Sequence, residues 1–293
     1  MRSGSSKTAI IIVGPTASGK TAFSLELAAK YYTAIISADS RQCYRELDIG
    51  VAKPSRQELA RCRHYFINSH SIHEPVDTVV FERESLAAAS EIFGTSDIAI
   101  VTGGTGLYVK VFCEGIDNMP SIDPDVKIKV ENAWQTGGLE ALQQWLTELD
   151  PLFMESSKEK DNRVRLMRAL EVKLSSGKSI LEYRAGTKKE RDFSIQKIGI
   201  EWPRDILYAR INKRVEDMIE AGLVDEAKAL YPYRQLKALQ TVGYQEMFEH
   251  FDGHYSLDEA IEKIKQHTRN YAKRQMTWFR KDEEIEWIKG SEH

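Results

Sequence analysis

The chain has 293 residues, enough for one large domain or for a core that carries an insertion, and 42% of them are hydrophobic, which excludes a disordered chain. The net charge of −3 excludes a uniformly basic nucleic-acid binder, so any contact with nucleic acid requires a local basic patch. Three cysteines without paired spacing indicate reduced thiols in a cytoplasmic protein and argue against zinc, and no apolar run is long enough to cross a membrane.

The first motif is a glycine-containing loop between an expected strand, residues 9–13, and an expected helix, residues 22–30. The loop fits the P-loop pattern G-x-x-x-x-G-K-[ST], and its members are Gly14, Pro15, Thr16, Ala17, Ser18, Gly19, Lys20 and Thr21. The glycines let backbone N–H groups turn inward, the lysine adds a point charge, and the Thr21 hydroxyl is placed to ligate Mg²⁺. The motif predicts a site for a polyphosphate or pyrophosphate with Mg²⁺ and leaves the reaction open.

A second buried strand is expected over residues 33–38, and it ends in Asp39. Ligands of open α/β sheets gather at the carboxyl ends of the strands, so Asp39 is expected to face the same crevice as the P-loop. The residue type alone also fits a helix cap or a turn. The loop that follows carries Lys53, whose spacing favours exposure to solvent; residues 65–67 are a short strand candidate, and residues 80–93 fit an amphipathic helix.

A third buried strand, residues 97–101, leads into Thr102-Gly103-Gly104-Thr105-Gly106. An ordinary P-loop ATPase often has an aspartate here that holds Mg²⁺. Glycines and a threonine instead offer backbone N–H groups and a hydroxyl, which can bind an oxyanion without adding negative charge. A plain turn is the alternative, and the position at a strand end favours the site.

From Met119 to about residue 196 the composition changes, and no parallel strand is predicted. Helices are expected over residues 123–134, 139–149 and 162–174, punctuated by prolines and glycines. We therefore predict a helical insertion domain, 119–196, within a P-loop catalytic core formed by 1–118 and 197–293. The arginines of the third helix fit either a solvated face or a face that contacts phosphates.

The core resumes with an expected strand over residues 197–201 and a helix over residues 205–221, whose Arg210 and Arg214 lie one turn apart on one face. Residues 240–244 read as a polar loop with the Tyr244 ring available for stacking.

The most basic segment, residues 263–281, contains no acidic residue. On a helical wheel Lys265, Arg269, Lys273 and Arg280 form a stripe, which fits either a phosphate backbone or a solubilising surface.

Taken together, the motifs resemble the tRNA dimethylallyltransferase family, also called tRNA isopentenyltransferases. The blocks that carry the resemblance are GPTASGKT at 14–21, SADSRQCYRELDIGVAKP at 37–54, VTGGTGLY at 101–108, NRVRLMRALEV at 162–172, VGYQEM at 242–247 and RNYAKRQMTWFR at 269–280. They span nearly the whole chain and occur in the family's order. The P-loop alone would be unspecific, whereas this set is highly specific.

The resemblance implies an α/β fold, with a P-loop, kinase-like parallel sheet core and an all-helical insertion domain. With the Mg²⁺ expected from the P-loop and the reduced cysteines, we expect a cytoplasmic enzyme that uses Mg²⁺ and works as a monomer. The implied reaction moves a dimethylallyl group from dimethylallyl pyrophosphate to the exocyclic N6 amine of the adenosine 3′ of the anticodon in the tRNA stem-loop.

The resemblance also assigns residue roles. The P-loop, Gly14 to Thr21, corresponds to the pyrophosphate site; Asp39 to the general base; Thr105 to a second pyrophosphate or transition-state contact; and Arg214 to an arginine that binds the leaving group. Lys127 stands where the family often has arginine, and Gln240 and Gln245 stand where basic residues are frequent. The segments matching tRNA contacts are Asp39, Ser40, Arg41, Gln42, Thr105, Lys127, Val164, Arg165, Leu166, Met167, Arg168, Gln240, Thr241, Val242, Gly243, Tyr244 and Gln245, with Lys273 and Arg274 on the basic helix.

Three other functions share some of these features. A small-molecule P-loop kinase would share the phosphate loop but would not need an RNA-binding surface. An adenylate isopentenyltransferase would share the core, so the insertion and the basic helix discriminate against it. A non-catalytic RNA-binding module would leave Asp39, Lys20 and Thr105 without a role.

Overall fold

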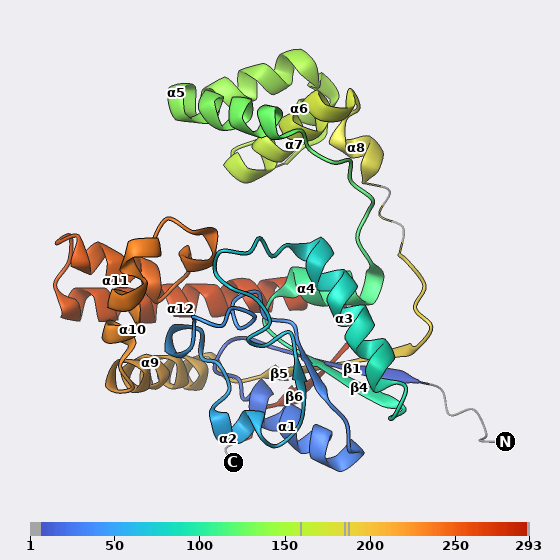
Figure 1. The fold of residues 1–293 in the computed structure, drawn as a ribbon, viewed down its shortest axis with the longest axis vertical. Coiled ribbons are helices and arrows are strands. Elements are labelled where there is room, and N and C mark those ends of the chain that lie inside the picture. Colours follow the sequence, from blue (N-terminus) through green and yellow to red (C-terminus); the bar gives the residue numbers. More distant parts are fainter. Residues whose placement is uncertain (1–6, 159, 185, 187, 292–293) are drawn as a thin grey trace. The chain divides into compact units, whose positions relative to one another are not determined.

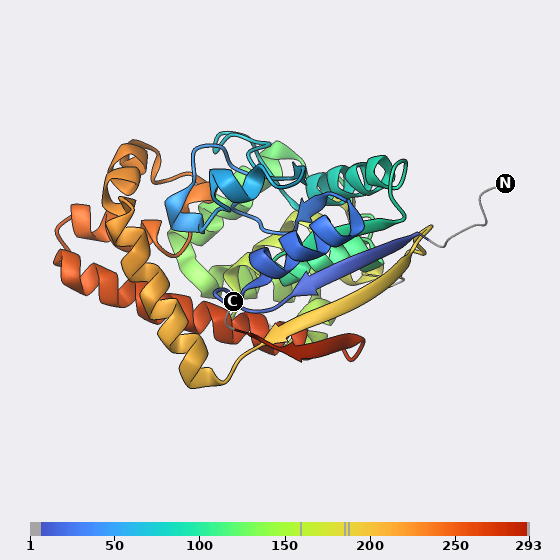
Figure 2. The same cartoon turned by 90° about the horizontal axis from the view of Figure 1, so that it is seen from below.

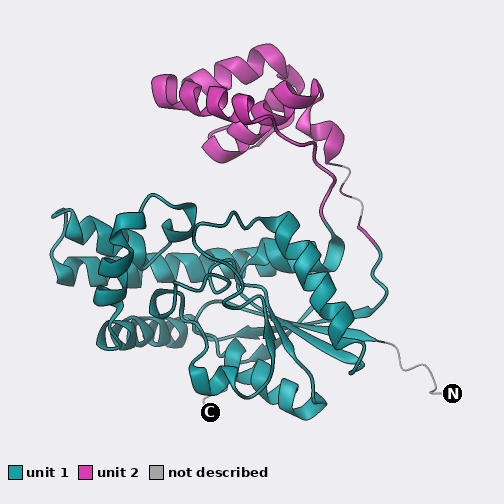
Figure 3. Ribbon diagram, in the orientation of Figure 1, with its two compact units in different colours: residues 1–115, 190–293 teal, residues 116–189 magenta. Residues whose placement is uncertain are grey.

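The computed structural model of the protein describes residues 7–158, 160–184, 186 and 188–291. The chain divides into unit 1, residues 1–115 with 190–293, and unit 2, residues 116–189 (Figure 3). The sequence placed the ends of the insertion at 119 and 196. The second end differs because the strand that resumes the core already begins at Ser194.

Unit 1 is built around a six-stranded parallel sheet with the strand order β3-β2-β4-β1-β5-β6 (Figure 1). The strands are β1 (Thr8–Val13), β2 (Ile35–Ser37), β3 (His64–Tyr65), β4 (Ile98–Thr102), β5 (Ser194–Glu201) and β6 (Ile285–Lys289). Figure 2 shows β1, β5 and β6 side by side. The predicted parallel α/β core is thereby confirmed, and β6 is a strand that the sequence analysis did not predict.

Helices cover both faces of the sheet, which explains why the central strands are apolar at every position rather than at alternate ones. On one face, Ile10 and Ile12 of β1 pack with Leu25 of α1. On the other face, Ile11 belongs to a larger cluster that includes Phe81 of α3. The helices of unit 1 are α1 (Lys20–Tyr31), α2 (Arg56–Leu59), α3 (Thr78–Ile92), α4 (Gly106–Glu114), α9 (Arg204–Glu220), α10 (Leu223–Leu230), α11 (Tyr244–Phe251) and α12 (Leu257–Phe279), with short 3-10 turns η1 (Ile49–Val51), η2 (Tyr231–Tyr233) and η3 (Lys237–Leu239).

Unit 2 consists of α5 (Pro124–Leu149), α6 (Pro151–Ser156), α7 (Arg163–Ser176) and α8 (Ile180–Tyr183). These helices enclose a separate apolar core that includes Leu142, Leu146 and Leu170. The two helices predicted over 123–134 and 139–149 are the two halves of α5, which meet across a kink at Gly138. Its backbone is non-helical only at Gly138 (φ 60°, ψ −148°), a conformation that glycine adopts without a Cβ penalty.

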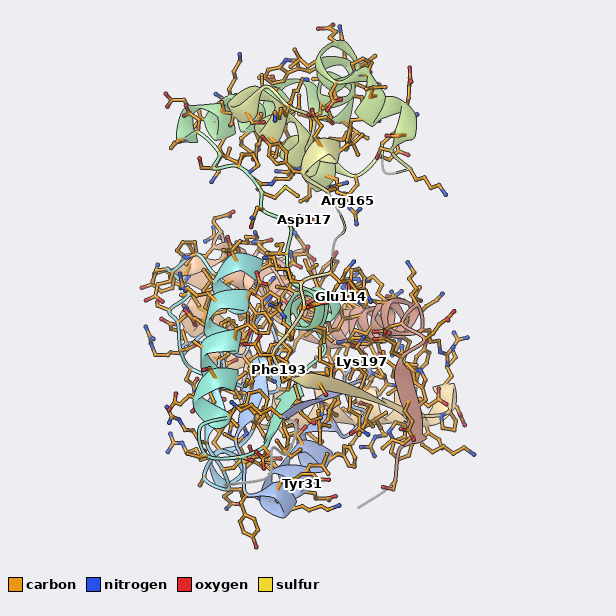
Figure 4. The ribbon with its side chains drawn as sticks, turned by 90° about the vertical axis from the view of Figure 1, so that its right-hand side faces the viewer. Tyr31, Glu114, Asp117, Arg165, Phe193 and Lys197 are labelled. Carbon is orange, nitrogen blue, oxygen red and sulfur yellow. The ribbon has the colours of Figure 1, made fainter. Side chains whose placement is uncertain are left out.

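The chain leaves unit 1 after Glu114, at the end of α4, and returns just before Phe193 (Figure 4). Arg191, where the chain re-enters unit 1, is held at the end of α4. Its guanidinium donates to the carbonyls of Val111 and Phe112 at 2.8 and 2.9 Å and pairs with Glu82 at 3.0 Å. The two connections between the units therefore start from neighbouring points of unit 1. Among the described residues, every helix is too short or too polar to traverse a lipid bilayer.

Candidate active site

A cavity of about 470 Å³ lies in unit 1 where β1, β2 and β4 end. Ligand sites of open α/β sheets form at this edge because the loops that follow neighbouring strands meet there. The cavity is lined by residues of the P-loop and α1 (16–22), the segment after β2 (39–42), η1 and its C-cap (50–52), α2 (58), the turn after β4 (102–104), α9 (210, 214, 215, 218), the loop before α11 (241–243) and α12 (264, 268, 271, 275).

The P-loop forms one wall of this cavity. Gly14 has a φ of 148°, and a Cβ there would lie 2.7 Å from the carbonyl oxygen of Ile200, so only glycine fits. The Lys20 ammonium donates to the carbonyls of Gly14 and Pro15 at 3.0 and 2.7 Å. Burial lowers the pKa of Lys20 to about 7; the charge of Arg214 adds to this effect, and the Asp39 carboxylate opposes it.

Asp39 is both a turn residue and a cavity residue. Its Oδ1 accepts the backbone N–H groups of Arg41 at 2.8 Å and Gln42 at 3.2 Å, which is the local turn geometry that the residue type allowed. The side chain also lines the cavity together with the P-loop. The two sequence interpretations therefore hold at once, since the backbone amides fix the direction in which the carboxylate points.

Thr105 fastens the turn after β4 to the segment after β2. Its Oγ1 accepts the N–H of Ser40 at 3.0 Å and donates to the Ser40 hydroxyl at 3.3 Å. Its own N–H donates to the carbonyl of Ala38 at 3.2 Å. Gly103 and Gly104 line the cavity, and a Cβ on Gly103 would come within 2.2 Å of the Ala38 carbonyl oxygen. The close approach of these two loops thus requires glycine.

Two arginines of α9 reach the P-loop from one helix face, as their spacing predicted. Arg210 Nε donates to the carbonyl of Ala17 at 2.9 Å, and Arg214 Nη1 lies 3.5 Å from the Thr16 hydroxyl. Burial, followed by the charge of Arg210, lowers the pKa of Arg214 from its usual value. With Lys20, these side chains concentrate positive charge beside the phosphate loop.

The side chains of Arg41 and Gln42 form hydrogen bonds to backbone carbonyls of the protein. The Arg41 guanidinium donates to the carbonyls of Lys237, Ala238 and Gln240 at 3.1 to 3.4 Å. The Gln42 amide donates to the carbonyls of Val51 and Ala52 at 3.4 and 3.1 Å. Both side chains therefore tie the segment after β2 to other loops that border the cavity.

Tyr244 and Lys53 differ from what the sequence indicated. Tyr244 is fully buried, and its hydroxyl donates to Glu226 at 2.5 Å, so its ring is not available for stacking. Lys53 turns inward and donates to the carbonyl of Tyr44 and to Asn68. Both expectations failed for one reason: the partner groups belong to other segments, 9 to 18 residues away, which a local pattern does not reveal.

The neighbours of Tyr244 lie at the cavity or on the surface. Thr241, Val242 and Gly243 line the cavity, whereas Gln240 and Gln245 are exposed and bond to each other at 2.9 Å.

Some of the cationic side chains on the basic face of α12 form ion pairs with acidic side chains. Lys265 pairs with Glu216 and Glu262, and Arg280 with Glu201, while Arg269 donates to Asn212 at 2.7 Å. The expected stripe is therefore interrupted by side chains from α9, β5 and the first turns of α12 itself. Lys273 and Arg274 are exposed, with the Arg274 guanidinium 5.7 Å from the centre of the Tyr271 ring.

In unit 2, the candidate RNA-contacting residues of α7 fall on different faces. Val164 is 72% exposed and Arg165 is also exposed, whereas Arg168 pairs with Glu171 at 3.4 Å. Leu166 is fully buried in the core of unit 2, so its side chain cannot present a surface to RNA. The other two candidates in this unit are Met167, which packs against that core, and Lys127 on α5, which is exposed.

Comparison with known proteins identifies the family. Residues 42–282 match the family model of the IPP transferases. The chain belongs to the IPP transferase family.

Curated and solved relatives of this IPP transferase cover nearly its whole length. The tRNA dimethylallyltransferase of Cytophaga hutchinsonii is 44% identical over 96% of this chain and 92% of its own. The solved tRNA isopentenylpyrophosphate transferase of Bacillus halodurans has a TM-score of 0.71 at 35% identity, covering 97% of this chain and 90% of that one. A eukaryotic dimethylallyltransferase, described as acting on tRNA, has a TM-score of 0.82 at 26% identity, covering 98% and 75%. The chain is accordingly an enzyme of the prenyltransferase class.

Sequence reasoning missed several cavity residues of this IPP transferase. Gln275 and Tyr271 line the cavity from α12, and Val215 and Met218 line it from α9. In the sequence these residues stand out only by lying on the inward face of an amphipathic helix. Residues that pack in the core have the same spacing, so the pattern does not distinguish the two. Among the described residues, no group of three His, Cys, Asp or Glu side chains could hold a metal.

Proposed function

We propose that the protein transfers a dimethylallyl group from dimethylallyl pyrophosphate to N6 of the adenosine 3′ of the anticodon in tRNA. One observation carries this proposal: a single cavity joins a P-loop, the Asp39 carboxylate and an apolar wall. The family membership and the whole-length similarity to proteins named tRNA dimethylallyltransferase support it.

The pyrophosphate is expected at the P-loop. The backbone N–H groups between Gly14 and Thr21, and the N-terminus of α1, suit an anion. Lys20, Arg210 and Arg214 add three cationic side chains around it. In the transfer, the bond between the allylic carbon and the pyrophosphate oxygen breaks. These cations then stabilise the charge that develops on the departing group.

Magnesium fits the donor set of this site. Mg²⁺ takes few protein ligands and keeps waters and substrate phosphates in its shell. The Thr21 hydroxyl lines the cavity, and Thr102 Oγ1, at the end of β4, is buried without a hydrogen-bond partner among the described residues. We infer that Thr21 binds the ion and that Thr102 supports it. When bound, the ion supplies further charge neutralisation for the leaving pyrophosphate.

The dimethylallyl group is expected to extend along α9, away from the phosphate loop. Arg214 faces Thr16 of the P-loop, and one turn further along α9 the cavity is bordered by Met218, with Val242 and Ile264 from other segments. These apolar side chains suit a five-carbon group. They also shield from water the positive charge that develops on the allyl group.

Asp39 is proposed as the general base. The exocyclic amine of adenine is a poor nucleophile, so a carboxylate that accepts its proton as the new C–N bond forms lowers the barrier. Thr105 holds the Asp39 segment through Ser40, which makes it a positioning residue for the base as well as a candidate contact to the substrate. The adenine has to leave its stack to reach this site, which is least costly in a loop.

The RNA is expected on the exposed candidates. These are Gln240, Gln245, Lys273 and Arg274 in unit 1, and Lys127, Val164 and Arg165 in unit 2, with the partly exposed Arg168 beside them. Recognition of an anticodon loop by exposed bases and phosphates suits such a set. We further propose that the protein works as a monomer in the cytoplasm.

An acceptor competition tests the function. The protein, with Mg²⁺ and dimethylallyl pyrophosphate labelled in the allyl group, is offered either unmodified tRNA or AMP. We expect the label on tRNA, and on the adenosine 3′ of the anticodon after nuclease digestion. Label on AMP would instead identify an adenylate isopentenyltransferase. Phosphorylation of a small molecule from ATP, without allyl transfer, would identify a kinase.

A further inference from the structure

Gln275 of α12 bridges two loops of the cavity. Its side chain is only 6% exposed. Oε1 accepts the backbone N–H of Thr16 in the P-loop at 2.8 Å, and Nε2 donates to the carbonyl of Gly104, in the turn after β4, at 2.9 Å. All three residues line the cavity. We call this pair of hydrogen bonds the Gln275 bridge.

The chemistry of the two partners fixes the amide. One partner is an N–H and the other is a carbonyl, so only one orientation of the side chain satisfies both. An ionised carboxylate of the same size accepts from Thr16 but cannot donate to Gly104. An apolar side chain of the same length satisfies neither partner. Glutamine is therefore the residue that completes the bridge.

Gly104 provides the room for this amide. A Cβ at position 104 would lie 2.1 Å from Gln275 Nε2, closer than real Cβ atoms approach a neighbour. Any side chain there has to displace the amide, because the backbone of this turn is also held to Ala38 by the N–H of Thr105. The Gln275 bridge can consequently be broken from either end.

Neighbours on the same helix face contact the same turn. Tyr271, one helical turn before Gln275, lines the same cavity as Gly103 and Gly104 of that turn. Trp278, almost one turn after it, lies against Gly106, where a Cβ would come within 2.2 Å of the indole. One face of α12 thus sets the position of the turn at residues 104–106, and Gln275 links that turn to the P-loop by a hydrogen bond at each end.

The Gln275 bridge also has an electrostatic consequence. A carbonyl oxygen that faces an anion site repels a diphosphate, because it carries partial negative charge. The Gly104 carbonyl is instead engaged by Gln275, and the N-terminus of α1, which begins at Lys20, adds its positive dipole end on the P-loop side. The bridge therefore favours an anion between the two loops.

We propose that Gln275 is a positioning residue for the diphosphate of the allylic substrate, holding the P-loop and the 104–106 turn at the separation that binds it. The inference rests on the proposed function and deepens it. It assigns Gln275 to diphosphate affinity rather than to RNA binding, although α12 also carries the exposed Lys273 and Arg274.

Two substitutions at one position and a matched control test this. Pyrophosphate affinity with Mg²⁺, tRNA affinity without pyrophosphate, and the melting temperature are measured for Gln275→Glu, Gln275→Met and Gln266→Glu. Gln266 is exposed on the same helix and receives the same new charge. Loss of two buried hydrogen bonds should weaken pyrophosphate binding by about tenfold in Gln275→Met, and the added charge should weaken it further in Gln275→Glu. We expect tRNA affinity to change by less than about twofold in both.

Gly104→Ala provides the second approach, since it displaces the amide while Gln275 stays intact. It should give the same selective loss of pyrophosphate affinity. Pyrophosphate binding at the wild-type level in folded Gln275→Met or Gly104→Ala would overturn the inference, and so would an equal loss in Gln266→Glu. If the wild-type protein itself does not bind pyrophosphate, the proposed function fails together with the inference.

Discussion

At the scale of single residues, Asp39 combines two tasks that one substitution can separate. Oδ1 accepts two backbone N–H groups, and the carboxylate faces the cavity. Asp39→Asn keeps an oxygen for the turn but removes the base. We expect transfer to fall by about 10² to 10⁴, while tRNA affinity and the melting temperature stay near the wild-type values. Single-turnover kinetics and a filter-binding titration measure the two effects. Near wild-type turnover in Asp39→Asn would remove Asp39 from the role of base.

Lys20 gives a prediction about pH. Its pKa in the free protein is lowered to about 7, mainly by burial, so its charge is present below that pH and is lost as the pH rises through it. Pyrophosphate favours the charged form. Above this pKa, the affinity for pyrophosphate should weaken by up to about tenfold per pH unit, and binding should be accompanied by uptake of a proton by Lys20. Calorimetry in two buffers of different ionisation enthalpy measures this proton. In Lys20→Met, the pH dependence of binding that remains comes from the titration of pyrophosphate itself. A pH dependence in that variant equal to that of the wild type would contradict the assignment to Lys20.

The sequence predicted individual residues where spacing alone defines the chemistry. Lys20 and Thr21 follow from the P-loop pattern, and Asp39 from its place at a strand end. Gln275 and Tyr244 did not follow. Whether a polar side chain on an amphipathic helix faces a cavity, the core or solvent depends on partners such as Gly104 and Glu226, which belong to other elements of the fold.

At the scale of elements, the strands were predicted where burial on both faces gives an unbroken apolar run, as in β1 and β4. β6 was missed because its five residues, IEWIK, neither form an unbroken apolar run nor alternate strictly in polarity, and among the described residues it pairs with β5 at the edge of the sheet. The break in α5 was predicted from Gly137 and Gly138, and two helices do meet there across a kink at Gly138.

The basic helix α12 gives the prediction at this scale. Lys265, Arg269 and Arg280 already have protein partners, so Lys273 and Arg274 are the pair that we expect on RNA phosphates. Reversing both charges should weaken tRNA binding and should lower the slope of log K against log salt by about 0.7 for each lost phosphate contact. Titrations at several salt concentrations measure the slope. Reversal of two exposed lysines elsewhere, Lys30 and Lys228, is the control, and an unchanged slope in the α12 variant would make that face a solvated surface.

At the scale of the whole molecule, the chain consists of two units with separate apolar cores. The cavity, the P-loop and Asp39 belong to unit 1, whereas Lys127 and the α7 candidates belong to unit 2. Changes of composition near Met119 were enough to predict that an insertion exists. Its end was predicted too late, because the first residues of β5 are polar and partly exposed and therefore resemble a loop.

This division predicts that the two kinds of binding can be separated. Arg191 contacts Val111 and Phe112, so the points where the chain leaves and re-enters unit 1 are neighbours, and a short Gly/Ser linker can replace residues 116–189. Because the sheet and the cavity walls lie outside the deleted segment, the shortened protein should unfold cooperatively and should bind pyrophosphate within about threefold of the wild-type affinity. Its tRNA affinity should fall by about tenfold or more, since the contacts from unit 2 are lost. Calorimetry and filter binding on the same preparation compare the two. If pyrophosphate affinity fell as far as tRNA affinity in a folded variant, the diphosphate site would depend on unit 2, and its assignment to unit 1 alone would be wrong.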